Sequence, residues 1–115
     1  MTEEKPHRFG LKEKVIFQIA DVLSKYPEIH SAVLYGSRAK GNYRKGSDID
    51  LTLKGIDISH RILLKIECDI DDLLLPYLFD ISIFTHIDNP ALIEHIDRVG
   101  IPLYQKKTAE LATSS

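Results

Sequence analysis

Residues 33–53 read VLYGSRAKGNYRKGSDIDLTL and combine two strand patterns with a glycine-containing, basic connection. The first pattern is the apolar run from Ala32 to Tyr35, which predicts a strand buried on both faces and ends at Gly36-Ser37. The second is the alternating run from Asp48 to Leu53, which predicts another strand. Residues 38–42 are expected to form a short helix between them. The predicted unit is a strand, a tight turn, a short helix, a loop and a second strand.

The remaining elements follow from the spacing of apolar residues. Apolar residues three and four apart predict helices, and runs rich in β-branched and aromatic residues predict strands. We expect a helix over 11–26, a helix over 60–75, a strand over 78–85, a helix from Asp88 to Val99, and a short edge strand over 101–104.

This order predicts one α/β (α+β) domain over residues 11–104, with a small mixed sheet and helices packed mainly on one side. Residues 1–10 are polar and are expected to be a loose N-terminal arm. Residues 105–115 contain few apolar side chains and are expected to be a frayed C-terminal tail.

Two carboxylates indicate a metal site. Asp48 and Asp50 are two residues apart on the predicted strand, so both side chains leave the same face. From that separation they can converge on one or two divalent cations, and Mg²⁺ suits a site with few carboxylates, water and substrate phosphates. Two metals would hold the attacking and leaving oxygens of a phosphoryl or nucleotidyl transfer.

Asp80 is the candidate for a third carboxylate. It is the one acidic residue in the apolar run 78–85, where a charge is costly unless it is compensated. If that strand lies beside the strand of Asp50, Asp80 falls on the same face as the pair. Asp80 is then the best candidate for the residue that activates the nucleophile.

The Gly-Ser turn indicates a phosphate site. Gly36 lets the backbone approach a ligand closely, and Ser37 offers an amide and a hydroxyl at the start of the short helix. Arg38 is adjacent to the turn and is the preferred phosphate partner among the cations of the basic loop. Each feature alone is weak, but the whole arrangement indicates a site for metal-bound phosphate.

Composition excludes several other classes of protein. The formal net charge of −2 provides no overall attraction to nucleic acid or to an anionic membrane. One cysteine, Cys68, excludes an intrachain disulfide and is typical of a reducing cytoplasm. The sequence contains no apolar run long enough to cross a membrane, so we expect a cytoplasmic protein.

Gly36-Ser37, followed after ten residues by Asp48-Ile49-Asp50, resembles the motif of the nucleotidyltransferase superfamily that includes DNA polymerase β. In particular, the spacing is similar to the pattern G-S-x10-D-x-D of the minimal nucleotidyltransferases (MNT), many of which are antitoxins paired with a HEPN-domain RNase. The resemblance covers roughly residues 11–104 and implies a nucleotidyltransferase-like fold.

The resemblance also implies a reaction, in which AMP is transferred from ATP with Mg²⁺. It implies that Asp48, Asp50 and Asp80 are catalytic metal ligands and that Gly36 and Ser37 bind the nucleotide. For antitoxin members the acceptor is a tyrosine hydroxyl of the HEPN partner, which implies a hetero-oligomer. The preference for ATP follows from this resemblance alone.

Two alternatives stay open at this point. The chain could be a non-catalytic nucleotide-binding module that neutralises or positions a partner by contact. It could also transfer AMP to a small molecule such as an aminoglycoside, although no acceptor-binding domain is visible in 115 residues.

Overall fold

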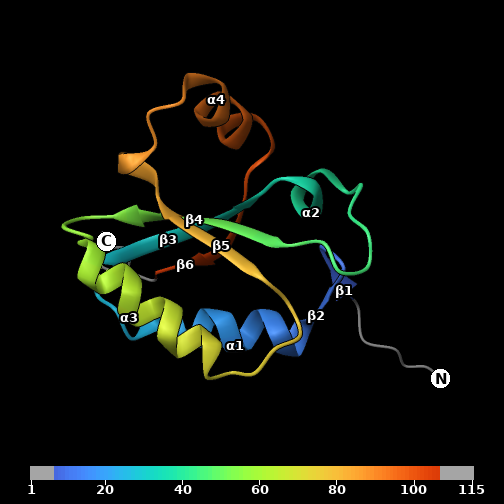
Figure 1. The fold of residues 1–115 in the computed structure, drawn as a ribbon, viewed down its shortest axis with the longest axis horizontal. Helices are drawn as coiled ribbons and strands as arrows, with labels where there is room; N and C mark the ends of the chain where they lie inside the picture. The colour runs from blue at the N-terminus through green and yellow to red at the C-terminus, as the bar shows by residue number, and fades with distance from the viewer. Residues whose placement is uncertain (1–6, 107–115) are drawn as a thin grey trace, which may run out of the picture.

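The computed structural model describes residues 7–106, and Figure 1 shows their ribbon. A four-stranded sheet in the order β5-β4-β3-β6 forms the centre, and a two-stranded hairpin, β1-β2, lies beside it. The strands are β1 (His7–Arg8), β2 (Leu11–Lys12), β3 (Ile29–Tyr35), β4 (Ile49–Gly55), β5 (Phe79–Ile83) and β6 (Ile101–Gln105). The helices are α1 (Glu13–Ser24), α2 (Ser37–Lys40), α3 (His60–Asp71) and α4 (Pro90–Val99), with a 3-10 turn, η1 (Phe84–His86), after β5.

The central sheet is mixed, as expected. β3 pairs antiparallel with β4 and β6, whereas β4 and β5 run parallel. Parallel neighbours need a crossover connection, and the chain from β4 to β5 makes it through α3. The apolar run that predicted a strand buried on both faces belongs to β3, which lies inside the sheet.

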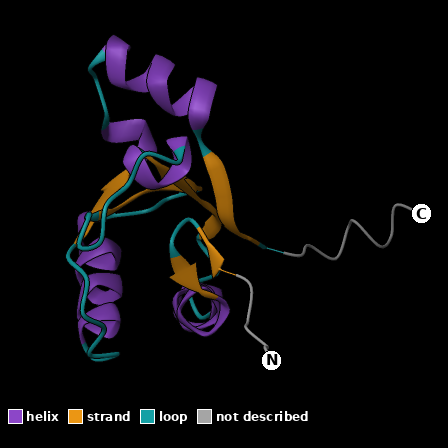
Figure 2. Cartoon of the chain, turned by 90° about the vertical axis from the view of Figure 1, so that its right-hand side faces the viewer, coloured by secondary structure: helices purple, strands orange, loops and turns teal. Residues whose placement is uncertain are grey.

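The larger core lies between the sheet and the helices α1 and α3. Leu34, Leu51 and Ile66 are completely buried there. α4 packs against the other face, where its Ile96 contacts Val33 in a smaller cluster. Figure 2 shows helices on both sides of the strands. The two longest helices share one side, which confirms the expected arrangement and leaves only part of the opposite face covered.

Side chains fix where α3 and α4 begin. The Ser59 hydroxyl accepts a hydrogen bond from the Ile62 N–H at 3.2 Å, and the side-chain Oδ1 of Asn89 accepts one from the Ala91 N–H at 2.9 Å. Pro90 at the first turn of α4 agrees with the helix start predicted from the sequence. Over residues 7–106, no helix is both long enough and apolar enough to span a membrane.

The N-terminal segment differs from the expected loose arm. Its described part forms the hairpin β1-β2, with a two-residue turn at Phe9-Gly10 whose φ values of 60° and 74° suit such a turn. At the other end, β6 extends to Gln105, and the Lys106 N–H donates a hydrogen bond to the His30 carbonyl at 2.8 Å. The rest of the expected arm and tail, residues 1–6 and 107–115, lies outside the described residues.

The predicted boundaries are less accurate than the predicted elements. The helix expected over 60–75 ends at Asp71, and three leucines follow it in a loop. The strand expected over 78–85 ends at Ile83, where the chain turns into η1. Apolar residues in connections extend a periodic pattern past the true end of an element.

Candidate active site

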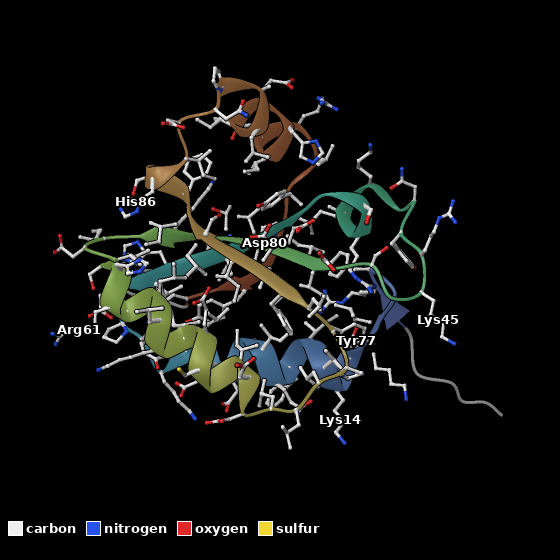
Figure 3. The ribbon with its side chains drawn as sticks, in the orientation of Figure 1. Lys14, Lys45, Arg61, Tyr77, Asp80 and His86 are labelled. Atoms are coloured by element: carbon white, nitrogen blue, oxygen red, sulfur yellow. The ribbon has the colours of Figure 1, made fainter. Side chains whose placement is uncertain are left out.

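Tyr35, Asp50 and Asp80 form one row across the sheet. Tyr35 of β3 is the register partner of Asp50 of β4, and Asp50 is the register partner of Asp80 of β5. Register partners point to the same face, whereas their neighbours Leu34 and Leu51 point into the larger core. The row therefore lies on the face that carries α4, where Figure 3 labels Asp80. This register confirms that Asp80 shares a face with Asp50.

Asp50 is electrostatically the most perturbed of the three aspartates expected in the site. It is half-buried, while Asp80 and Asp48, which lies one residue before β4, are exposed. Burial raises the pKa of the Asp50 carboxyl, the Asp80 and Asp48 carboxylates raise it further, and His95 lowers it. Both other carboxylates are therefore close enough to Asp50 to disfavour its ionised form.

Replacing Asp50 with Asn is expected to stabilise the ligand-free protein at neutral pH. Because the folded state raises the pKa of Asp50, it binds protons more tightly than the unfolded state, and the free energy of unfolding falls as pH rises through that interval. Asn removes this cost, so Asp50→Asn should gain about 0.5 kcal/mol, or about 2 °C in Tm, a modest figure because solvent screens a half-buried carboxyl. Thermal unfolding at several pH values checks the sign.

The difference between the two proteins should shrink in acid, where the wild-type carboxyl is neutral in both states. Mg²⁺ should stabilise the wild type more than Asp50→Asn if the carboxylate binds the metal. A variant less stable than wild type at every pH would contradict the electrostatic interpretation.

Gly36 lies directly against Asp50. Its φ of 77° and ψ of −155° place it in a backbone region that is essentially restricted to glycine. A Cβ built on Gly36 would lie 2.4 Å from Asp50 Oδ2, which is far inside contact distance. The glycine therefore allows the turn and the carboxylate to occupy adjacent positions, with the partly exposed Ser37 next along the chain.

His95 and Tyr35 are site residues that the sequence did not single out. The Gly36 N–H donates a hydrogen bond to His95 Nε2 at 3.1 Å, which ties α4 to the turn. The His95 ring meets the Tyr35 ring edge-on, with 6.1 Å between the centroids. Burial raises the pKa of the Tyr35 hydroxyl, a hydrogen bond with Ser82 lowers it, and Asp80 and Asp50 raise it. No sequence spacing links His95 to Gly36, so the sequence held no signal for His95. Tyr35 could have been found only from its register with Asp50.

Arg38 occupies a different place from the one expected of a phosphate ligand. It is only 3% exposed, and its Nη2 donates to the Ser47 carbonyl at 2.8 Å while its Nη1 donates to the Phe9 carbonyl at 2.8 Å. The guanidinium also lies 5.4 Å from the ring centroid of Tyr43 and 5.2 Å from that of Tyr77. These contacts make Arg38 an anchor for the loop that leads to Asp48. Direct phosphate binding by Arg38 stays a prediction.

The aspartate carboxylates are the kind of ligand that a divalent cation prefers, but they are too few to fill its ligand shell. Within residues 7–106, no group of three or more His, Cys, Asp or Glu side chains is arranged closely enough to hold a metal ion. The Asp80 carboxylate helps to raise the pKa of its register partner Asp50, and a cation bound beside Asp50 would offset that repulsion. Mg²⁺ commonly binds through one or two carboxylates and completes its shell with water and substrate phosphates.

A surface pocket lies away from Asp50 and Asp80. Its volume is about 660 Å³, and it is lined by residues of α3, which include Leu64 and Asp69, and by Tyr26, which follows α1. Tyr26 donates a hydrogen bond to Asp69, which raises the pKa of the tyrosine to about 12. Since α1 and α3 cover the opposite face of the sheet, this pocket cannot receive a ligand that contacts Asp50 and Asp80.

Comparison with known proteins identifies the family and the fold of the chain. A family model described as "Polymerase beta, Nucleotidyltransferase" matches residues 17–109, and no curated protein matches the chain. One similar solved structure is a toxin–antitoxin complex with AMP-PNP, at 17% identity and a TM-score of 0.65, covering 84% of this chain and 78% of its own.

Two further structures share the fold. A mutant of the toxin–antitoxin MntA–HpeT has 14% identity and a TM-score of 0.63, with the same coverage of 84% and 78%. A protein from Sulfolobus solfataricus, assigned as a nucleotidyltransferase, has 18% identity and a TM-score of 0.50, covering 81% of this chain and 79% of its own. At these identities the likeness is one of fold.

Proposed function

Because the chain belongs to the polymerase β nucleotidyltransferase family, we propose that it transfers AMP from ATP to a hydroxyl of a partner protein. The acceptor oxygen attacks the α-phosphorus of ATP and forms a new O–P bond. The bond from the α-phosphorus to the bridging oxygen breaks, and pyrophosphate leaves with the electron pair. The register of Asp50 with Asp80, beside the Gly36-Ser37 turn, is the observation that carries this proposal.

The three aspartates and the Gly36-Ser37 turn each have a task in this reaction. Asp80, on the edge strand, accepts the proton of the attacking hydroxyl, and Ser37 donates its hydroxyl to a phosphate oxygen. Asp48, Asp50 and Asp80 would hold one or two Mg²⁺ ions. A bound divalent cation neutralises phosphate oxygens and stabilises the charge that develops on the leaving group. Gly36 keeps the nucleotide turn against the Asp50 carboxylate.

The acceptor we propose is a tyrosine on a HEPN-domain RNase toxin, with this chain as its antitoxin. Two structures that share the fold carry toxin–antitoxin names, and one of them contains AMP-PNP. The motif spacing resembles that of the minimal nucleotidyltransferases. We expect this partner chain to complete the site by bringing its tyrosine hydroxyl to Asp50 and Asp80.

α-Labelled ATP and Mg²⁺ added to a lysate of the source cell test this function. Wild-type protein should label one protein band, and the Asp48→Asn, Asp50→Asn double variant should label none. The mass of the labelled protein then identifies the partner, and acid hydrolysis identifies the modified hydroxyl. Wild-type protein that binds Mg-ATP but labels no protein would contradict the proposed transfer.

The same double variant distinguishes catalysis from contact. If the variant binds the partner but no longer suppresses its RNase activity, suppression requires AMP transfer. If suppression survives the loss of both carboxylates, the chain acts by contact and the proposed function is wrong.

A further inference from the structure

One side of β5 is unpaired. β5 is an edge strand, and the Ile49 N–H donates to the Leu78 carbonyl at 2.9 Å. In a parallel pair, alternate residues of a strand direct both their N–H and their C=O groups toward the same neighbour. The backbone groups of Leu78 and Asp80 therefore face β4. Those of Phe79 and Ile81 face away from it. No other strand of the described chain pairs with that side. β5 therefore offers N–H and C=O groups on which an added strand can pair.

A groove runs along this edge. Its volume is about 280 Å³, and it lies between β5 and α3, which Figure 1 shows below β5. Its charged side chains, Glu67 and Asp71, are both acidic. Its apolar lining includes Ile70, Tyr77, Phe79 and Ile81. The groove therefore suits a ligand that is apolar and positively charged.

Two leucines in the connection from α3 to β5 are highly exposed, and one of them, Leu78, also lines the groove. Leu78 is 73% exposed, and Leu74 in the loop between α3 and β5 is 86% exposed. Leu74 also has a φ of 56°, a left-handed conformation that is unfavourable for leucine. Exposed leucines next to an open strand edge are typical of a protein-binding surface.

We propose that β5 receives the acceptor segment as an added strand. The occupant is an extended stretch of the partner protein, with apolar and basic side chains at alternate positions. This inference rests on the proposed transfer to a protein hydroxyl and states how that hydroxyl reaches the site.

Strand pairing places the acceptor without further adjustment. Side chains of an added strand alternate between the two faces of the sheet. Apolar side chains in line with Phe79 and Ile81 enter the groove, and lysine or arginine two positions further along the same face reaches toward Glu67 and Asp71. The side chain in line with Asp80 lies on the same face as its carboxylate, so a tyrosine, serine or threonine there presents its hydroxyl to Asp80.

Two synthetic peptides of equal composition test this register. In Lys-Gln-Leu-Tyr-Leu-Gln-Lys, the tyrosine lies on one face and every lysine and leucine on the other. In Lys-Leu-Gln-Tyr-Gln-Leu-Lys, the leucines share the tyrosine face. Wild-type protein with Mg²⁺ and α-labelled ATP should modify the first peptide with a KM at least about fivefold lower, as expected when two leucine contacts worth together about 1 kcal/mol are misplaced in the second. Equal KM values would overturn the proposal.

Charge reversal in the groove provides the second test. The Glu67→Lys, Asp71→Lys double variant should raise the KM for the first peptide about five- to tenfold and leave Mg-ATP binding unchanged. Replacing both peptide lysines with glutamate should restore the low KM. The matched control is Asp21→Lys, Asp97→Lys, which reverses two exposed carboxylates on α1 and α4 and should leave the KM unaltered. An unchanged KM in the groove variant would overturn the proposal.

Backbone methylation of the first peptide distinguishes strand pairing from other docking. N-methyl groups placed at one position at a time should abolish AMP transfer at alternate positions only, because alternate N–H groups face β5. Losses without this period of two would overturn the proposal. If wild type labels a protein in lysate but neither peptide, the edge site is wrong and the transfer stands; if it labels neither protein nor peptide, the transfer itself is wrong.

Discussion

Asp80→Asn should reduce the rate of AMP transfer by about 10³-fold, within the range typical of a lost general base. The amide cannot accept the proton of the attacking hydroxyl, and it is a poorer metal ligand than a carboxylate. Asp80 is exposed and has nearly the size of Asn, so the fold should persist. Steady-state transfer to the labelled partner, with thermal unfolding measured in parallel, checks both parts.

A matched variant separates catalysis from surface charge. Asp97→Asn removes an exposed carboxylate from α4 and should leave the rate within a factor of two. Full activity of Asp80→Asn at neutral pH would remove Asp80 from the mechanism. The alignment of Asp80 with Asp50 across the sheet would then have no role in catalysis.

Gly36→Ala should lower kcat by about 10²-fold, the loss typical of a catalytic group displaced by about 1 Å. The new Cβ would lie 2.4 Å from Asp50 Oδ2, so the carboxylate or the turn must move. The backbone conformation adds about 1–3 kcal/mol of strain. Single-turnover kinetics and thermal unfolding separate the loss of rate from the loss of stability.

Gly41→Ala is the control for strain without collision. Gly41 has a φ of 92°, so alanine is strained there too, but no atom lies within 4 Å of the added Cβ. This variant should lose stability by about 1 kcal/mol and keep most of its kcat. Equal losses of kcat in the two variants would mean that strain, and not the contact with Asp50, decides activity.

The shared face of Asp50 and Asp80 could be predicted largely from local sequence patterns. The isolated acid of the apolar run 78–85 could be assigned to the face of Asp50 because period two fixes faces once the strands are neighbours. The structure shows that the two strands are neighbours, with β4 and β5 parallel and joined by a crossover through α3. These features depend on residues close together in the chain or on strict periodicity.

The partners of Arg38 and Gly36 could not be predicted in the same way. A positive side chain next to a phosphate turn is compatible with binding a ligand or with packing, and only the tertiary structure shows that Phe9 and Ser47 accept its hydrogen bonds. The contact of His95 with Gly36 joins residues that are 59 positions apart in the chain. Polar contacts of this kind have no periodic signature in a single sequence.

The neighbours of Arg38 determine when during synthesis the site can form. Phe9, Ser47 and Tyr77 contact one guanidinium, although they come from the beginning, the middle and the later part of the chain. Such long-range contacts form late, because closing long loops costs entropy before any contact compensates it. On the ribosome, a nascent chain that ends before Tyr77 lacks one of the aromatic rings that contact Arg38. It also lacks Asp80, the register partner of Asp50. If the proposed transfer needs Asp80 beside Asp50, a chain becomes active only after β5 has joined the sheet, and unfinished chains would leave the partner unmodified.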